Sequence, residues 1–214
     1  MSVSVRIGGM QEIILASGSP RRFDLLTAMG VSFRVIPSAY DEHLDDTRTP
    51  DEVAMELGLG KALAVADLYP DAIVIGSDTI VCIDGKQLGK PADATEAFET
   101  LRDLSGRENQ VVTSVAIVCK ATGLRRVGVY TANVLFKTFN DALVRAYVAT
   151  GDPLDKAGSY GIQSGAASLV EHIQGDFDAI IGLPTHLLAE YLNELGITST
   201  PVDLECPVPQ VATR

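Results

Sequence analysis

The chain has 214 residues, of which 46% are hydrophobic and 21% are charged, so it is long enough to bury a substantial core without disulfides. The 28 Asp and Glu residues outnumber the 17 Lys and Arg residues, which gives a net charge of −11. This balance argues against a broad nucleic-acid-binding surface, because phosphate backbones bind basic faces, but it leaves room for a small polyanion in a local basic pocket.

Predicted helices and strands alternate in the first half of the chain, and strands cluster after that. Residues 1–11 are expected to be a loose leader. Short apolar or alternating runs predict strands at 12–17, 31–37, 72–83, 110–119, 127–139 and 168–173. Helical spacing of apolar residues predicts helices at 20–29, 49–69, 93–105, 140–150 and 184–195. A glycine-rich loop spans residues 151–165.

This order of elements favours an α/β fold, or mixed α+β, with helices on the faces of a mixed sheet. No break in composition marks a linker, so residues 12–197 are predicted to form a single domain. The tail at 198–214 contains three prolines and shows no helical or strand periodicity, so it is predicted to be disordered.

The sequence shows no sign of export or membrane insertion. No apolar stretch reaches the ~18 residues of a membrane span, and the first residues lack the apolar region of a signal peptide. Cys82, Cys119 and Cys206 lie far apart, which favours reduced thiols over a metal site or a disulfide. We therefore expect a cytoplasmic protein without a membrane partner.

Asp78 is the strongest chemical oddity, because it interrupts the apolar run IVIGSDTIVCI. A buried carboxylate is costly and needs a cation, a metal or several donors, unless a bulge lets it cap its own backbone. Glu42 belongs to an acidic loop that either forms a solvated face or folds over Asp78. In the second case two hard oxygen ligands converge, and they would suit Mg²⁺ or Mn²⁺.

The few basic residues admit both structural and functional interpretations. Lys90 lies in a turn before a predicted helix. Lys61 lies on the long helix, where a lysine that extends along the surface is the simpler interpretation. Lys156 and Gln163 lie in the glycine-rich loop, whose backbone can approach a ligand closely. Gln163 either contacts a base edge or caps a turn.

The segment LASGSPRRFDLL places small residues and two arginines where a strand gives way to a helix. Ser17 and the nearby backbone donors suit an anion, because helix N-termini attract negative charge. Arg21 and Arg22 oppose the helix macrodipole by ~0.3–1 kcal/mol each unless something compensates them. A bound phosphate would do so, and so would an internal partner such as Asp24 or the acidic loop.

Five motifs, in this order, resemble those of the Maf family of nucleoside triphosphate pyrophosphatases: LASGSPRRFDLL, GSDTIV, GKP, GDPLDKAGSYGIQ and GDFDAIIGLP. The resemblance implies an elongated, two-lobed fold with a central mixed sheet, similar to inosine triphosphate pyrophosphatases. It also implies a cleft between the lobes, a divalent metal cofactor and a homodimer. The activity it implies is house-cleaning hydrolysis of nucleoside triphosphates to the monophosphate and pyrophosphate.

The resemblance also assigns roles by position. Asp78 would match the catalytic acid and Glu42 its partner, and the two would hold the metal. The residues that would match the phosphate-facing positions are Ser17, Arg22, Lys61 and Lys90, with Lys90 also among the catalytic groups. The residues that look like those of the subgroup acting on dTTP and UTP are Arg21, Thr79 and Gln163.

Three functions remain open at this stage. The first is hydrolysis of dTTP and UTP, which the intact pair of acids favours. The second is a nucleotide-sensing regulator of septum formation, or a nucleotide-binding module, with little turnover. The third is hydrolysis of a modified nucleotide such as 7-methyl-GTP. The family subgroup that acts on 7-methyl-GTP typically differs from this chain at the residue after the proline and at the residue after the catalytic acid.

Overall fold

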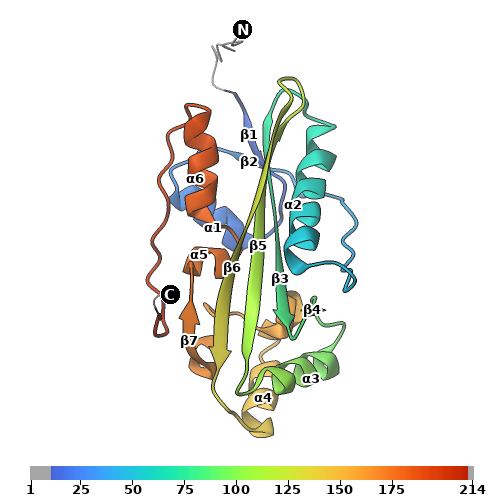
Figure 1. Cartoon of the computed structure of the whole chain (residues 1–214), viewed down its shortest axis with the longest axis vertical. Coiled ribbons are helices and arrows are strands. Elements are labelled where there is room, and N and C mark those ends of the chain that lie inside the picture. Colours follow the sequence, from blue (N-terminus) through green and yellow to red (C-terminus); the bar gives the residue numbers. More distant parts are fainter. Residues whose placement is uncertain (1–10, 212–214) are drawn as a thin grey trace.

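The computed structural model describes residues 11–211, so almost all of the predicted leader lies outside the described residues. Within that range a mixed sheet of seven strands runs along the long axis of the molecule (Figure 1). The strands are β1 (Ile13–Leu15), β2 (Arg34–Val35), β3 (Ile73–Ile83), β4 (Lys86–Leu88), β5 (Glu108–Cys119), β6 (Leu124–Phe136) and β7 (Val170–Gln174). The α-helices are α1 (Pro20–Ala28), α2 (Pro50–Ala66), α3 (Ala94–Leu104), α4 (Asp141–Val148), α5 (Phe177–Ile181) and α6 (Thr185–Glu194).

The strand order is β2–β1–β3–β5–β6–β7, with β4 paired to β3. β1 runs parallel to β2 and β3, and the remaining pairs are antiparallel. On the edge of β3 opposite β5, β1 pairs with Ile73–Ile75 and β4 pairs with Val81–Ile83. In the described part of the chain no strand pairs with this edge between those two stretches, so the middle of β3 is open on one side.

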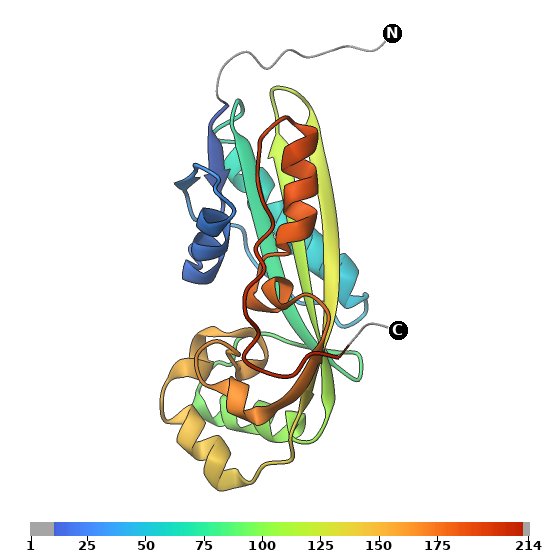
Figure 2. The same ribbon diagram turned by 90° about the vertical axis from the view of Figure 1, so that its left-hand side faces the viewer.

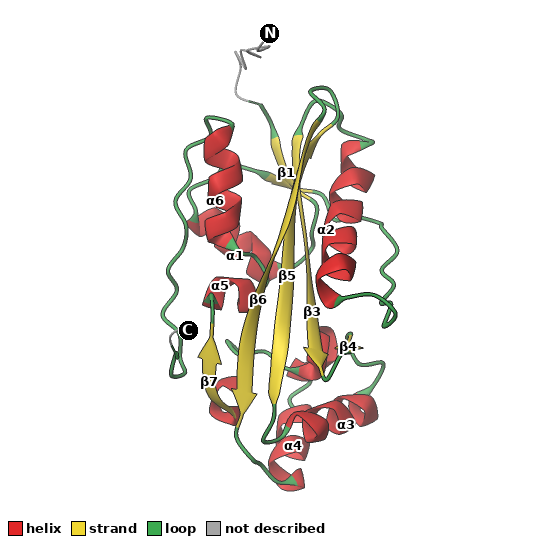
Figure 3. Ribbon diagram, in the orientation of Figure 1, coloured by secondary structure: helices red, strands yellow, loops and turns green. Residues whose placement is uncertain are grey.

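Helices cover both faces of one half of the sheet, and a second group closes the other end. α2 lies on one face, while α1, α5 and α6 lie on the opposite face (Figures 1 and 2). α3, α4 and the short 3-10 turns of residues 152–169 gather around the far end of the long strands (Figure 3). The mixed α/β fold with an elongated shape is therefore confirmed.

Two glycines let α2 lie close against β3. A Cβ atom added at Gly76 of β3 would stand 2.2 Å from the carbonyl oxygen of Gly58 in α2, and a Cβ at Gly58 would stand 2.3 Å from Oγ of Ser114. Larger residues would therefore push the helix off the sheet. This close approach brings the next turn of α2, which carries Lys61, against the middle of β3.

The long elements follow the prediction, and two short ones differ. The capping box of Thr49 and Glu52 is present at the start of α2. The strand expected at 31–37 shrinks to Arg34–Val35, because its partner β1 is itself only three residues long. α5 was not predicted, since a helix of five residues is too short to show a period of 3.6.

Residues 198–211 do not follow the prediction of a disordered tail. They run back along the molecule as an extended segment in which Val208 is buried. Ile173 of β7 donates its backbone N–H to the carbonyl of Pro209 and accepts from the N–H of Val211, both at 2.9 Å. Prolines fit such an edge segment because their missing N–H groups are not needed for the pairing.

Asp178 of α5 is linked to this tail through the hydroxyl of Thr185. Asp178 is only 2% exposed. Its carboxyl group accepts a hydrogen bond from Thr185 Oγ1 at 2.7 Å. Thr185 Oγ1 in turn accepts from the backbone N–H of Val202 at 3.0 Å. Burial raises the pKa of Asp178 to about 6, and the neighbouring charge of Asp176 acts in the same direction.

The elevated pKa of Asp178 predicts a pH-dependent stability. The folded protein holds this proton more tightly than the unfolded chain, so its contribution is full below pH ~4 and is lost as pH rises through about 6. From pH 4 to pH 7 we expect the wild type to lose roughly 1–3 kcal/mol relative to Asp178→Asn. Urea unfolding of both proteins at several pH values measures this difference. A difference that stays constant across the range would contradict the prediction.

Candidate active site

A cavity of about 610 Å³ lies beside the open edge of β3. The N-terminal turn of α1 contributes to its wall, as do the acidic loop after β2, the middle of α2 and the glycine-rich loop. These segments come from distant parts of the sequence, and the interrupted pairing along β3 leaves space between them. All nine residues to which the sequence or the family resemblance assigned a role line this cavity: Ser17, Arg21, Arg22, Glu42, Lys61, Asp78, Thr79, Lys90 and Gln163.

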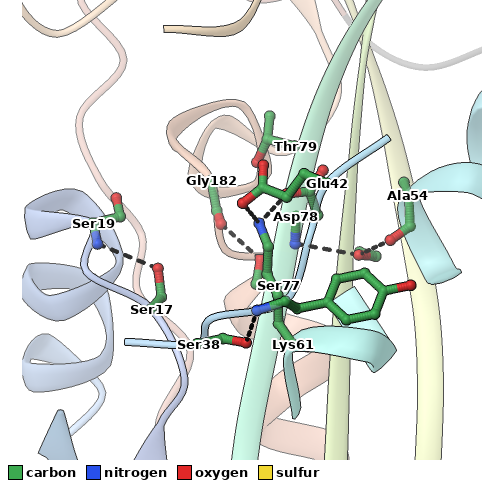
Figure 4. Close-up of polar contacts among 12 residues, drawn as sticks. Ser17, Ser19, Ser38, Glu42, Ala54, Lys61, Ser77, Asp78, Thr79 and Gly182 are labelled. Atoms are coloured by element: carbon green, nitrogen blue, oxygen red, sulfur yellow. Dashed lines mark hydrogen bonds and ion pairs between the residues drawn. The ribbon is translucent and has the colours of Figure 1, made fainter. Parts of the chain in front are cut away.

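Lys61 bridges two carboxylates at the centre of the cavity wall. Its Nζ lies 2.8 Å from Oε1 of Glu42 and also forms an ion pair with Oδ1 of Asp78 (Figure 4). The side chains of Lys61 and Asp78 are each 9% exposed, whereas that of Glu42 is 49% exposed. The interpretation of Lys61 as an ordinary surface lysine is therefore wrong, because α2 turns it inward onto β3.

The strand around Asp78 is regular, with no bulge. Asp78 stands opposite Ser114 of β5 in an unbroken antiparallel register. Its backbone N–H donates to Ser114 Oγ at 3.3 Å, and that hydroxyl donates to the carbonyl of Ala54 in α2 at 2.6 Å. The carboxylate of Asp78 therefore does not cap its own backbone, and Lys61 supplies the cation that a buried carboxylate requires.

The acidic loop reaches Asp78 because two contacts hold it there. The ring of Tyr40 occupies the space over Gly60 of α2, where a Cβ atom would lie 2.4 Å from the ring. Gln87 of β4 donates its side-chain amide to the carbonyl of Asp45 at 2.8 Å. Burial alone would raise the pKa of Glu42, but the hydrogen bond and charge of Lys61 outweigh it and lower that pKa. Glu42 is thus a carboxylate at neutral pH.

Arg22, which also lines the cavity, is held by neutral groups. Its guanidinium donates to the carbonyl of Gly182 at 2.8 Å, to Thr79 Oγ1 at 3.1 Å and to Ser17 Oγ at 3.2 Å. Within residues 11–211 no carboxylate forms an ion pair with it, so the internal partner considered from the sequence is not observed. Burial lowers the pKa of Arg22, while Asp78 and Glu42 oppose that shift, and an arginine still remains cationic.

The remaining candidates lie at the rim of the cavity. Lys90 and Gln163 are exposed, and Arg21 is half-buried. Lys156 lines the cavity too, but its Nζ binds Asp152 at 2.9 Å and Asp155 at 2.6 Å. The lysine of the glycine-rich loop therefore stabilises the loop itself.

Comparison with known proteins covers the segment that contains all of these residues. A family model described as "Maf-like protein" matches residues 12–195. The chain belongs to the Maf family. Its site residues therefore lie in a segment that the family model covers throughout.

Several curated relatives share most of this chain. A protein of Symbiobacterium thermophilum is 45% identical over 87% of this chain and 95% of its own length. A protein of Bacillus cereus is 44% identical over 89% of this chain and 99% of its own length. A protein of Pelotomaculum thermopropionicum is 42% identical over 87% of this chain and 98% of its own length. Each of these relatives is named dTTP/UTP pyrophosphatase.

A solved structure of the Staphylococcus aureus Ham1 protein is also similar, with a TM-score of 0.49 and 16% identity. The match covers 86% of this chain and 100% of that one. Likeness at this level supports no conclusion about the site. No helix in the described range is both long and apolar enough to cross a membrane.

Three buried polar residues of this Maf protein escaped the sequence analysis. Ser77, Thr113 and Ser114 are each 0% exposed and lie on β3 or β5 next to the site. Ser77 Oγ donates to the same Gly182 carbonyl that Arg22 binds, at 3.0 Å. The available signal was a pair of hydroxyl residues in the apolar run VVTSVAI, which a buried strand does not need for packing.

The bridge through Lys61 predicts a large loss of stability when it is removed. Lys61→Met leaves the buried Asp78 carboxylate without its cation, so we expect about 3–5 kcal/mol of destabilisation in urea unfolding. The matched control is the double variant Lys61→Met/Asp78→Asn, which removes the buried charge and should recover much of that loss. A loss below ~1 kcal/mol in the single variant, the range of exposed ion pairs, would contradict this role.

Proposed function

We propose that this protein hydrolyses nucleoside triphosphates, with dTTP and UTP as preferred substrates, to the monophosphate and pyrophosphate. The observation that carries the proposal is the bridge of Asp78 and Glu42 by Lys61, which faces a cavity that also holds Arg22. The names of relatives 42–45% identical to this chain support the same reaction and the same bases.

The cationic groups explain how an acidic protein accepts a triphosphate with about four negative charges. Arg22 enters the cavity with three of its five N–H groups bound to neutral acceptors, which leaves two donors and its full charge for the ligand. Arg21 and Lys90 add charge at the rim. We assign Ser17, Arg22, Lys61 and Lys90 to the phosphates, where fixed cations stabilise charge in phosphoryl transfer.

The two carboxylates fit a divalent cation. An ammonium group already lies between Glu42 and Asp78, so a positive charge is accommodated at this point. The described residues contain no group of three or more His, Cys, Asp or Glu side chains that could hold a metal, but Mg²⁺ commonly takes one or two carboxylates and completes its shell with water and phosphate oxygens. When bound, Mg²⁺ or Mn²⁺ would neutralise phosphate charge and activate water.

Asp78 is the group that we assign to the attacking water. Its carboxylate lines the cavity on a strand that pairs with β5 in an unbroken register, so it can accept a proton from a water bound there. Lys61 keeps this carboxylate oriented, and it has one further N–H group once its bonds to Asp78 and Glu42 are counted. Arg21, Thr79 and Gln163 are assigned to the base end of the substrate, and Lys90 to the reacting phosphates.

The resemblance also leads us to expect a homodimer in the cytoplasm. The link to septum formation rests on the same resemblance. These expectations concern the assembly and the cell, and none of the residue assignments depends on them.

Replacing Asp78 by Asn tests the proposal directly. We expect Asp78→Asn to lower pyrophosphate release from UTP with Mg²⁺ by about 10²–10⁴-fold, because general-base catalysis contributes about that much. Asp71→Asn is the matched control, since Asp71 is exposed, precedes the same strand and does not line the cavity. Near-wild-type turnover in a folded Asp78→Asn protein would refute the assignment, and a wild type inactive on all triphosphates would refute the function.

A further inference from the structure

Two threonines face each other at the cavity. Thr79 of β3 and Thr113 of β5 are direct partners in the antiparallel register. Thr79 is the one residue of β3 that is not buried, and it lines the cavity, whereas Thr113 is 0% exposed. Ligand can therefore meet Thr79 but not Thr113.

The hydroxyl proton of Thr113 has a fixed destination. Thr113 Oγ1 lies 2.8 Å from the carbonyl oxygen of Ala179 in α5 and 3.1 Å from Thr79 Oγ1. A carbonyl only accepts, so the Thr113 proton must lie on the shorter contact to Ala179. The oxygen–oxygen contact between the threonines then needs the proton of Thr79, because otherwise two lone pairs would face each other.

α5 is held firmly enough to keep that carbonyl in place. Ser77 Oγ and Arg22 Nε both donate to the carbonyl of Gly182, at 3.0 and 2.8 Å, directly after the helix. All five residues of α5 are buried. The hydrogen-bond direction at Thr113 is therefore set by a rigid element.

The hydroxyl of Thr79 has one proton and two lone pairs, and its known contacts show which of them remain free for a ligand. Its proton goes to Thr113, and one of its two lone pairs accepts from Arg22 Nη2 at 3.1 Å, which is a donor under all conditions. One lone pair remains for the cavity. A ligand atom that bonds to Thr79 must therefore bring its own hydrogen.

We propose that Thr113 is a positioning residue that fixes Thr79 as a hydrogen-bond acceptor and so selects a pyrimidine base with a ring N–H. Phosphate oxygens carry no proton for this bond at neutral pH, and Thr79 is one of the residues assigned above to the base end, so we place a base N–H rather than a ribose hydroxyl against it. Uracil and thymine carry hydrogen on the ring nitrogen between their two carbonyls, while cytosine has a bare acceptor there. This inference rests on the proposed function and explains one part of its base preference.

Steady-state kinetics on UTP and CTP test the role of Thr113. Thr113→Val keeps the shape of the side chain but frees the Thr79 proton, so we expect the ratio of kcat/KM for UTP over CTP to fall about tenfold, the range of one mismatched polar contact. Thr113→Ser keeps the hydroxyl and should hold the ratio within about twofold of wild type. Thermal unfolding establishes that each variant is folded.

The possible outcomes separate this inference from the proposed function. Equal losses on UTP and CTP in Thr113→Val, or an unchanged ratio, would overturn the role of Thr113 and leave the pyrophosphatase activity standing. A wild type that releases no pyrophosphate from any nucleotide would overturn the proposed function itself.

If Thr113→Val fails to fold, neutron diffraction on the wild type decides. A deuteron on Thr79 that points to Thr113 supports the inference, and one that points into the cavity overturns it.

Discussion

The site depends on one buried lysine whose single positive charge lies between two carboxylates. Asp78 lies in a strand that is otherwise apolar, where an unpaired charge would be costly. Lys61 reaches it because Gly58 and Gly76 let α2 lie directly on β3. A Cβ atom at either glycine would move the helix, and with it the cation. The close packing of α2 on β3 therefore also fixes the position of the positive charge in the cavity wall.

The alternation of side chains along β3 divides the chemistry between its two faces. Asp78 meets Lys61 of α2, whereas Ser77 meets Gly182 (Figure 4). Thr79 lies on the same face of the strand as Ser77 and accepts a hydrogen bond from Arg22. Asp78 and Thr79 both line the same cavity because the edge of β3 is open between its contacts with β1 and β4. Under the proposed assignment, one strand serves both the reacting phosphates and the base.

The sequence was informative where the physics is local. Asp93 and Asn140 cap α3 and α4 at the residues where the predicted helices begin, and Asp78 was conspicuous because it broke an apolar run. Tertiary packing decided the rest. Nothing local shows that Lys61 turns inward, that the proline-rich tail pairs with β7, or that Thr113 lies behind Thr79. The family resemblance gave a phosphate-facing role to Lys61, where its position on a helix alone had suggested a surface residue.

The central claim is that the carboxylates bridged by Lys61 form the reaction centre. A crystal structure with Mg²⁺ and a non-hydrolysable UTP analogue tests it most directly. The account predicts that an oxygen of Asp78 binds the metal directly and that Lys61 and Arg22 contact phosphate oxygens. A complex in which Asp78 stays bonded only to Lys61, with metal and triphosphate bound elsewhere, would contradict it.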